Sequence, residues 1–214
     1  TARHNKEYQF IKQACVVWLA NFPGDLYVKF LQAQNFMAVG QIDQSVSLLR
    51  QVLGQDPQFI EVYPLLMESD SDSVDKQECV SIHHYLTHES PADLPEPEWI
   101  QSMWASRQAH TEGDREKAIA LINEAMVADP SSALPAILHL KIAFDLQDDA
   151  MLANLSEIYL LRWPDCLQIN LLKALAELNQ GDEAQAVERL HWIAAKDNSG
   201  QVIHSLIVDA ASCP

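Results

Sequence analysis

The sequence predicts an all-α protein, a right-handed α-solenoid of antiparallel helix pairs with a period of about 34 residues. The first observation is a series of prolines: Pro23, Pro57 and Pro91, then Pro130 and Pro164. Each of these follows the previous one at the same spacing, except that the interval between Pro91 and Pro130 is longer. Composition is the second observation. Only 6 of 214 residues are Gly, whereas Ala, Leu and Gln are frequent, which favours helix over strand.

Glycines report the same period independently. Gly40, Gly113 and Gly181 each lie half a repeat before a repeat-closing position, at Pro57, Pro130 and Asn198. A half-repeat holds one helix of about 12–14 residues and a short turn. Glycine after the first helix allows the left-handed conformation that ends it, and proline after the second cannot continue that helix.

The spacing of these prolines and glycines gives the expected elements in chain order. A half-repeat, 1–23, holds a helix over about 4–21. Five helix-pair repeats follow at 24–57, 58–91, 97–130, 131–164 and 165–198, with a stiff Pro-rich insert at 92–96. The expected helices are 25–39 with 41–54, 58–68 with 73–88, 97–111 with 114–128, 131–145 with 148–161, and 165–179 with 182–196. The segment 199–214 is expected to end in a capping helix over about 201–212.

The repeat resembles the tetratricopeptide repeat (TPR) family. That family has a small residue near the middle of the second helix, a large apolar residue four positions later and a closing proline. The pattern occurs here at Ser45 and Leu49, at Ala118 and Ile122, and at Ala186 and Leu190. The units 58–91 and 131–164 depart from it, with Val74 and Gln147 where the turn glycine would fall. The resemblance covers about 24–198 and implies a TPR-like fold.

Charge restricts the partners. The chain is an acidic protein, with 30 Asp and Glu against 14 Lys and Arg and a formal net charge of -16. Such a surface repels phosphate backbones and anionic membranes, so we expect neither nucleic-acid nor membrane binding. The four cysteines, Cys15, Cys79, Cys166 and Cys213, form no CxxC pair and indicate isolated thiols. Isolated thiols favour a reducing compartment, and we expect a cytoplasmic protein.

Two polar clusters are candidates for metal sites. His84 and His88 share a helix face, but no third ligand has suitable spacing nearby. Asp70, Asp72 and Asp75 lie in a loop without the Gly and terminal Glu of a calcium loop. The sequence also contains no GxSxG, P-loop or GxGxxG motif. We therefore expect no metal, no cofactor and no enzymatic activity.

The first helix of each pair faces the concave side in TPR solenoids, so the resemblance implies a partner-binding groove there. By phase, the groove residues expected from the first, third and fourth pairs are Tyr27, Phe30, Gln34, Met37, Met103, Arg107, His110, Ile137, Lys141 and Phe144. The alternative is that the apolar members pack in the core, because apolar residues at helical spacing usually do. The family's clamp for a C-terminal carboxylate uses Lys, Asn and Arg at several of these places, and they are largely absent here.

The sequence thus predicts a protein-interaction scaffold that presents a concave groove to a peptide or amphipathic helix of an unidentified partner protein. Each unit is expected to touch only its neighbours. The alternative is a regulatory or oligomerisation segment of a larger signalling or transcription protein. The first helix carries more apolar surface than one neighbour can cover, including Phe10, Val17 and Trp18. Self-association through this helix is therefore a further expectation, as is a longer repeat array of which this chain is a piece.

Overall fold

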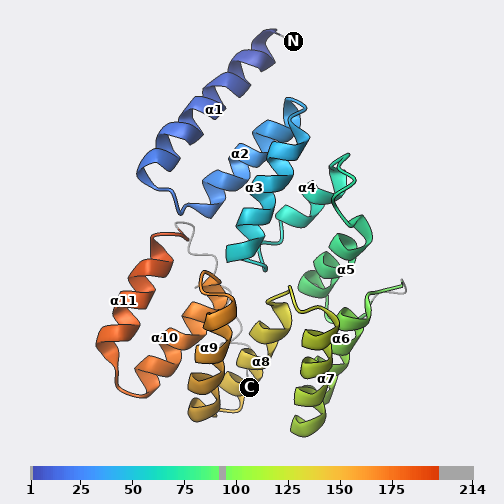
Figure 1. The fold of residues 1–214 in the computed structure, drawn as a ribbon, viewed down its shortest axis with the longest axis vertical. Helices are drawn as coiled ribbons and strands as arrows, with labels where there is room; N and C mark the ends of the chain where they lie inside the picture. Colours follow the sequence, from blue (N-terminus) through green and yellow to red (C-terminus); the bar gives the residue numbers. More distant parts are fainter. Residues whose placement is uncertain (1, 92–94, 198–214) are drawn as a thin grey trace.

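The computed structural model describes residues 2–91 and 95–197, with side chains from Glu7 onward, and in this part of the chain it is entirely helical. The helices are α1 (Ala2–Asn21), α2 (Leu26–Ala38), α3 (Ile42–Gln55), α4 (Val62–Glu68), α5 (Lys76–Thr87), α6 (Glu98–Thr111), α7 (Arg115–Ala128), α8 (Leu134–Asp145), α9 (Asp149–Arg162), α10 (Leu167–Asn179) and α11 (Glu183–Ala194). Neighbouring helices pack in pairs, which confirms the all-α helical repeat fold (Figure 1). The capping helix expected over 201–212 lies outside the described residues.

The turns inside the first, third, fourth and fifth pairs have the same geometry. Gly40, Gly113 and Gly181 have φ angles of +78°, +83° and +83°, which confirms the predicted left-handed closure of the first helix. Gln147 occupies the same place in the fourth pair and is also left-handed, with φ of +53°. In the third pair, the amide of Asp114 donates to the carbonyl of Ala109 at 2.8 Å, and the other three turns make the equivalent bond. This is the bonding of a Schellman motif, which satisfies carbonyls left free at a helix end.

Aspartates begin most of the second helices. The side chains of Asp114, Asp148 and Asp182 accept hydrogen bonds from the amides of Lys117, Met151 and Gln185, each three positions further on. These bonds satisfy backbone donors that have no partner inside the helix. The repeated Gly-Asp and Gln-Asp sequences therefore both end one helix and begin the next.

The second pair is the least regular. Its first helix, α4, begins at Val62, four positions later than expected from the spacing. The carboxylate of Asp56 accepts the amide of Gln58 at 2.9 Å, and backbone bonds from Phe59 to Asp56 and from Val62 to Phe59 hold the chain in turns. These local bonds compete with helix for the same residues, so α4 is short.

The chain curves until its last described pair meets its first. The amide of Leu26 donates to the carbonyl of Lys196 at 3.3 Å, so the end of α11 lies beside the start of α2 (Figure 1). A Cβ at Gly24 would lie 2.9 Å from Cγ of Lys196, which explains a glycine at this contact. Leu167, Leu171 and Ile193 of the last pair share one apolar core with residues of α2, α3 and α4.

The expectation that each unit touches only its neighbours is therefore wrong. Apolar faces at the two ends of the repeat are buried against each other, and this covers surface that an open array would leave for separate caps. The right-handed superhelix stays a prediction.

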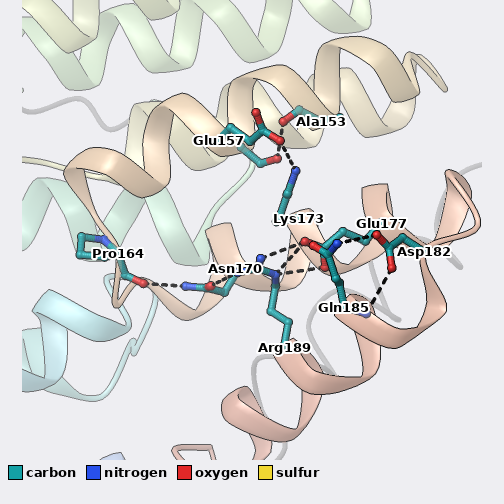
Figure 2. Close-up of polar contacts among 10 residues, drawn as sticks. Ala153, Glu157, Pro164, Asn170, Lys173, Glu177, Asp182, Gln185 and Arg189 are labelled. Carbon is teal, nitrogen blue, oxygen red and sulfur yellow. Dashed lines mark hydrogen bonds and ion pairs between the residues drawn. The ribbon is translucent and has the colours of Figure 1, made fainter.

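The closure of the last pair on the first also explains why α10 is buried on nearly every side. Its buried polar residues are Gln168, Asn170, Lys173 and Glu177. Figure 2 shows how three of them are satisfied: Arg189 donates to both carboxylate oxygens of Glu177 and to Asn170, and Lys173 pairs with Glu157 at 2.8 Å. Buried polar groups are tolerated when they are hydrogen-bonded in this way.

Candidate functional site: a cleft between α6 and α8

A cleft of about 320 Å³ lies between α6, α8 and the end of α5. Its apolar lining includes Met103 and Ile137, both 1% exposed, and Leu138. Tyr85 and Leu86 of α5 form another wall. The ionisable lining residues are Arg107 and His110 from α6, and Lys141 and Asp145 from α8. The cleft therefore combines an apolar interior with charged groups.

The repeat itself positions these side chains. Met103, Arg107 and His110 follow one another at intervals of four and three, so they share one face of α6. Ile137 and Lys141 stand one full repeat after Met103 and Arg107, and they share a face of α8 in the same way. Because α6 and α8 pack against each other, equivalent positions of two successive repeats line one cleft.

Two aromatic rings make cation–π contacts with the guanidinium of Arg107. It lies 5.3 Å from the ring centroid of Tyr85 and 5.0 Å from that of Trp104. Its Nη1 also lies 3.5 Å from the carbonyl oxygen of Tyr85. Burial raises the pKa of the Tyr85 phenol well above its ordinary value, so the ring stays neutral. These contacts orient a cation at the cleft wall before any ligand binds.

One contact crosses the cleft. Nε2 of His110 lies 3.3 Å from Oδ2 of Asp145, which joins α6 to α8. Arg107 and Lys141 have basic side chains, whereas Asp145 is the one carboxylate among the described residues of the lining. Basic residues thus outnumber acidic ones here, although the whole chain has a net charge of -16. Such a cleft can hold an apolar side chain beside a carboxylate or another acceptor of hydrogen bonds.

Five of the ten residues predicted for the groove line this cleft: Arg107, His110 and Lys141, and also Met103 and Ile137, which are fully buried in the core as the alternative predicted. The other five do not line this cleft. Phe30 is buried, with its ring 5.3 Å from that of Phe59, in the core that α2, α3 and α4 share with the last pair. Phe144 packs partly buried against the core of α8, α9 and α10.

The remaining three belong to α2. Tyr27 is 46% exposed with its ring 6.4 Å from that of Phe30, whereas Gln34 is exposed and Met37 is half-buried.

Sequence reasoning missed Asp145, Tyr85 and Leu86. Asp145 could have been found, because it lies four positions after Lys141 and so shares its helix face. Tyr85 and Leu86 come from α5, in the unit whose TPR-like pattern is weakest, and they carry no signal of that kind. Their position beside α6 depends on how the chain passes from α5 to α6.

A second cavity, of about 420 Å³, lies between α3, α5 and the α7–α8 turn. Its polar groups bind one another: Arg50 donates to the Ser73 carbonyl, and Trp99 donates to Glu78 at 3.2 Å. Burial raises the pKa of Glu78, and the indole hydrogen bond opposes that shift. The α6–α8 cleft is the stronger candidate because five of the residues predicted for the groove line it, whereas none of them lines this cavity.

The two candidate metal clusters are engaged in local contacts. The rings of His84 and His88 stack with centroids 4.0 Å apart, and Nε2 of His84 lies 2.9 Å from the Ser90 carbonyl oxygen. Asp75 accepts the amide of Glu78 and begins α5. Over residues 2–91 and 95–197, no group of three or more His, Cys, Asp or Glu is arranged to hold a metal ion.

Cys15, Cys79 and Cys166 are buried free thiols. None of the helices in the described ranges is long and apolar enough to cross a membrane.

Comparison of the sequence with protein-family models and with curated proteins finds no match.

Proposed function

We propose that this chain is a TPR-like protein-interaction scaffold, not an enzyme, and that the α6–α8 cleft binds a peptide or helix of a partner protein. The observation that carries the proposal is the alignment of Met103 with Ile137, and of Arg107 with Lys141, across successive repeats. This gives a cationic row beside two apolar side chains that form the buried floor of the cleft. An amphipathic segment has the complementary pattern.

The size of the cleft supports one particular mode of binding. About 320 Å³ is near the lower limit of ligand pockets, so the cleft holds one or two anchoring side chains and not a whole helix. An anchor of this kind is typically a large apolar residue, with near-neutral contacts around it that exclude water. Arg107, fixed by two aromatic rings, would select an acidic or carbonyl group next to that anchor.

Selection from a displayed random-peptide library tests the proposal. Peptides enriched on the wild-type chain are labelled, and their affinities are measured by fluorescence anisotropy for wild type and for Arg107→Ala/Lys141→Ala. We expect the double variant to bind at least tenfold more weakly. Lys117→Ala is the matched control, because Lys117 is an exposed cation of α7 outside the cleft, and it should bind as wild type does.

Circular dichroism on each variant checks that the fold is kept. Equal binding by wild type and the double variant, or no enrichment of any peptide, would contradict the proposal. The alternative, an oligomerisation or regulatory segment of a larger protein, draws on a different surface, the exposed face of α1.

A further inference from the structure

The N-terminal helix carries an apolar stripe that the described part of the fold leaves uncovered. Phe10 is 72% exposed, Val17 65%, Trp18 44% and Ile11 39%, and Ala14 is also exposed. These five residues, the α1 stripe, have the spacing i, i+1, i+4, i+7, i+8, which places them on one side of a helix. The adjoining side, with Cys15 buried and Leu19 half-buried, packs on α2.

Helix α1 is fixed in place by specific contacts. Nε1 of Trp18 donates to Asp25 at 2.8 Å, and Nδ2 of Asn35 donates to the Tyr8 carbonyl at 2.9 Å. Figure 1 shows α1 at the edge of the molecule, alongside α2. The α1 stripe is thus a surface on an ordered helix about 30 Å long.

We propose that the α1 stripe is a self-association surface, and that its occupant is the α1 stripe of a second copy of this chain in an antiparallel, two-fold symmetric pair. A two-fold contact uses the same patch on both copies, so the patch must be complementary to itself. The α1 stripe is complementary to itself when the two-fold axis passes beside Ala14. Antiparallel pairing places Phe10 of one copy opposite Trp18 of the other, and Ile11 opposite Val17.

The small residue at the centre allows this contact. With Ala14 facing Ala14, the helix axes can approach to the roughly 8–10 Å that helix packing requires. The large residues then lie on both sides of the two-fold axis. Lys12 is not part of the α1 stripe and Glu7 lies beyond its end, so the pair buries neither charge at its centre.

Charge also favours this face over others. Residues 1–21 contain three Lys or Arg and one Glu, whereas the whole chain has a net charge of -16. Pairing through α1 keeps the acidic remainder of the two copies apart, and the α1 stripe itself contains no charged residue. A second copy therefore approaches through α1.

Area sets the strength of the pair. Since an aromatic side chain buries about 150–250 Å² when fully covered, the exposed fractions give roughly 500 Å² of apolar surface per copy. Two copies then bury roughly 1,000 Å², at the lower limit for a specific interface. We therefore expect a weak, concentration-dependent dimer.

Sedimentation velocity of the whole chain over a hundredfold range of concentration tests the proposal. Wild type should shift from monomer to dimer and stop there. Phe10→Glu/Val17→Glu should weaken the dimer at least tenfold, without loss of fold because both side chains point to solvent. Val127→Glu/Leu161→Glu is the matched control, since these residues are 79% and 89% exposed on α7 and α9, and it should dimerise as wild type does.

Disulfide trapping tests the geometry, in a Cys213→Ser background. Ala14→Cys should form a covalent dimer on mild oxidation, because the two thiols meet at the two-fold axis. Lys12→Cys, exposed but outside the α1 stripe, should not. A chain that stays monomeric at every concentration, an assembly that grows beyond dimer, or equal trapping at the two positions would overturn the proposal.

Discussion

The side-chain amide of Gln168 donates a hydrogen bond to the carboxylate of Asp56, which lies 112 positions earlier in the chain. Asp56 ends α3 and Gln168 lies in the first turn of α10, so this bond joins the first helix pair to the last. Both residues are 5% exposed. The contact that closes the repeat on itself is thus polar and buried, beside the apolar core formed by Leu167 and Ile193.

Replacing Asp56 with Asn should stabilise the protein at neutral pH. Burial raises the pKa of Asp56 from 3.8 to about 6. Between these two values the folded state binds more protons than the unfolded state, so the free energy of unfolding falls as pH rises. Asn keeps an acceptor for Gln168 without the charge. We expect a gain on the order of 2 kcal/mol at pH 7, since one pKa unit corresponds to about 1.4 kcal/mol.

Urea denaturation of Asp56→Asn at pH 4 and pH 7 measures this effect. Asp129→Asn is the control, because Asp129 ends α7 as Asp56 ends α3 but is only half-buried. Its effect should be small at both pH values. If Asp56→Asn is less stable than wild type at pH 7, the carboxylate is needed in its charged form and the explanation fails.

The long-range bond also marks the limit of what the sequence predicts. Helix pairs and their turns follow from local signals, such as Gly113 followed by Asp114, whose backbone and side chain act within a few residues. The pairing of Gln168 with Asp56 depends on the sum of small rotations over five units, and no local pattern encodes it. The phase of α2 alone predicts Phe30 in the groove, although Phe30 lies in the core that the first pairs share with the last.

The residues of the cleft also divide into those that the sequence predicts and those that it does not. Arg107 and Lys141 could be placed together because the repeat period relates them and each helix face is predictable from its phase. Tyr85, which holds Arg107, could not, since α5 belongs to an irregular unit. Gln147 shows a further limit, because the left-handed turn is kept there without the glycine that usually signals it.

Acid should weaken the protein through His139. This residue is 5% exposed, its Nδ1 lies 2.7 Å from the Tyr159 hydroxyl, and its buried Nε2 has no hydrogen-bond partner among the described residues. Burial lowers the pKa of His139 from 6.5 to about 4. As pH falls through this window, the unfolded state takes up a proton that the folded state does not, so the free energy of unfolding decreases.

The test is best made in Asp56→Asn, since Asp56 gives a slope of opposite sign over part of this window. Adding His139→Leu/Tyr159→Phe removes both partners of the buried bond and should be nearly neutral at pH 7. The same change should flatten the loss of stability between pH 6.5 and 4. An unchanged slope in urea denaturation would show that other groups cause the acid sensitivity.

Removing Arg189 alone should destabilise the protein more than removing Arg189 and its partner Glu177 together. Glu177 has a side chain only 4% exposed, and Arg189 supplies its ion pair (Figure 2). Arg189→Met leaves a buried, unpaired carboxylate and should cost about 3–5 kcal/mol, whereas Glu177→Leu/Arg189→Met should recover most of this loss. Arg115→Met is the control, because the side chains of Arg115 and its partner Asp148 are 46% and 31% exposed and such a pair contributes little. Chemical denaturation at pH 7 ranks the variants, and a double variant as unstable as Arg189→Met would contradict this account.

Glycine at position 147 should stabilise the fourth turn. A left-handed conformation costs a residue with a side chain about 1–2 kcal/mol, and glycine at position 147 would remove this cost. Part of the resulting stabilisation is offset, because glycine has more conformational freedom in the unfolded chain. We expect Gln147→Gly to stabilise by about 0.5 kcal/mol. The reverse change, Gly113→Ala, should destabilise by about 1 kcal/mol through the φ angle alone, since no atom of the described residues lies within 4 Å of the added Cβ. Thermal denaturation measures both, and shifts of the same sign would refute the turn argument.

Ala118 should not tolerate a large side chain. It is fully buried where α6 and α7 pack together, and its carbonyl accepts the Ser106 hydroxyl at 2.9 Å. A larger residue would force the two helices apart and break that bond. Since overpacking a filled core costs about 1–3 kcal/mol or more, Ala118→Trp should lower the denaturation midpoint clearly. Ala120→Trp, on the exposed face of the same helix, separates this effect from a change in helix propensity and should leave the midpoint nearly unchanged. Equal midpoints for the two variants would mean that α6 and α7 are not held at the distance that the Ser106 bond requires.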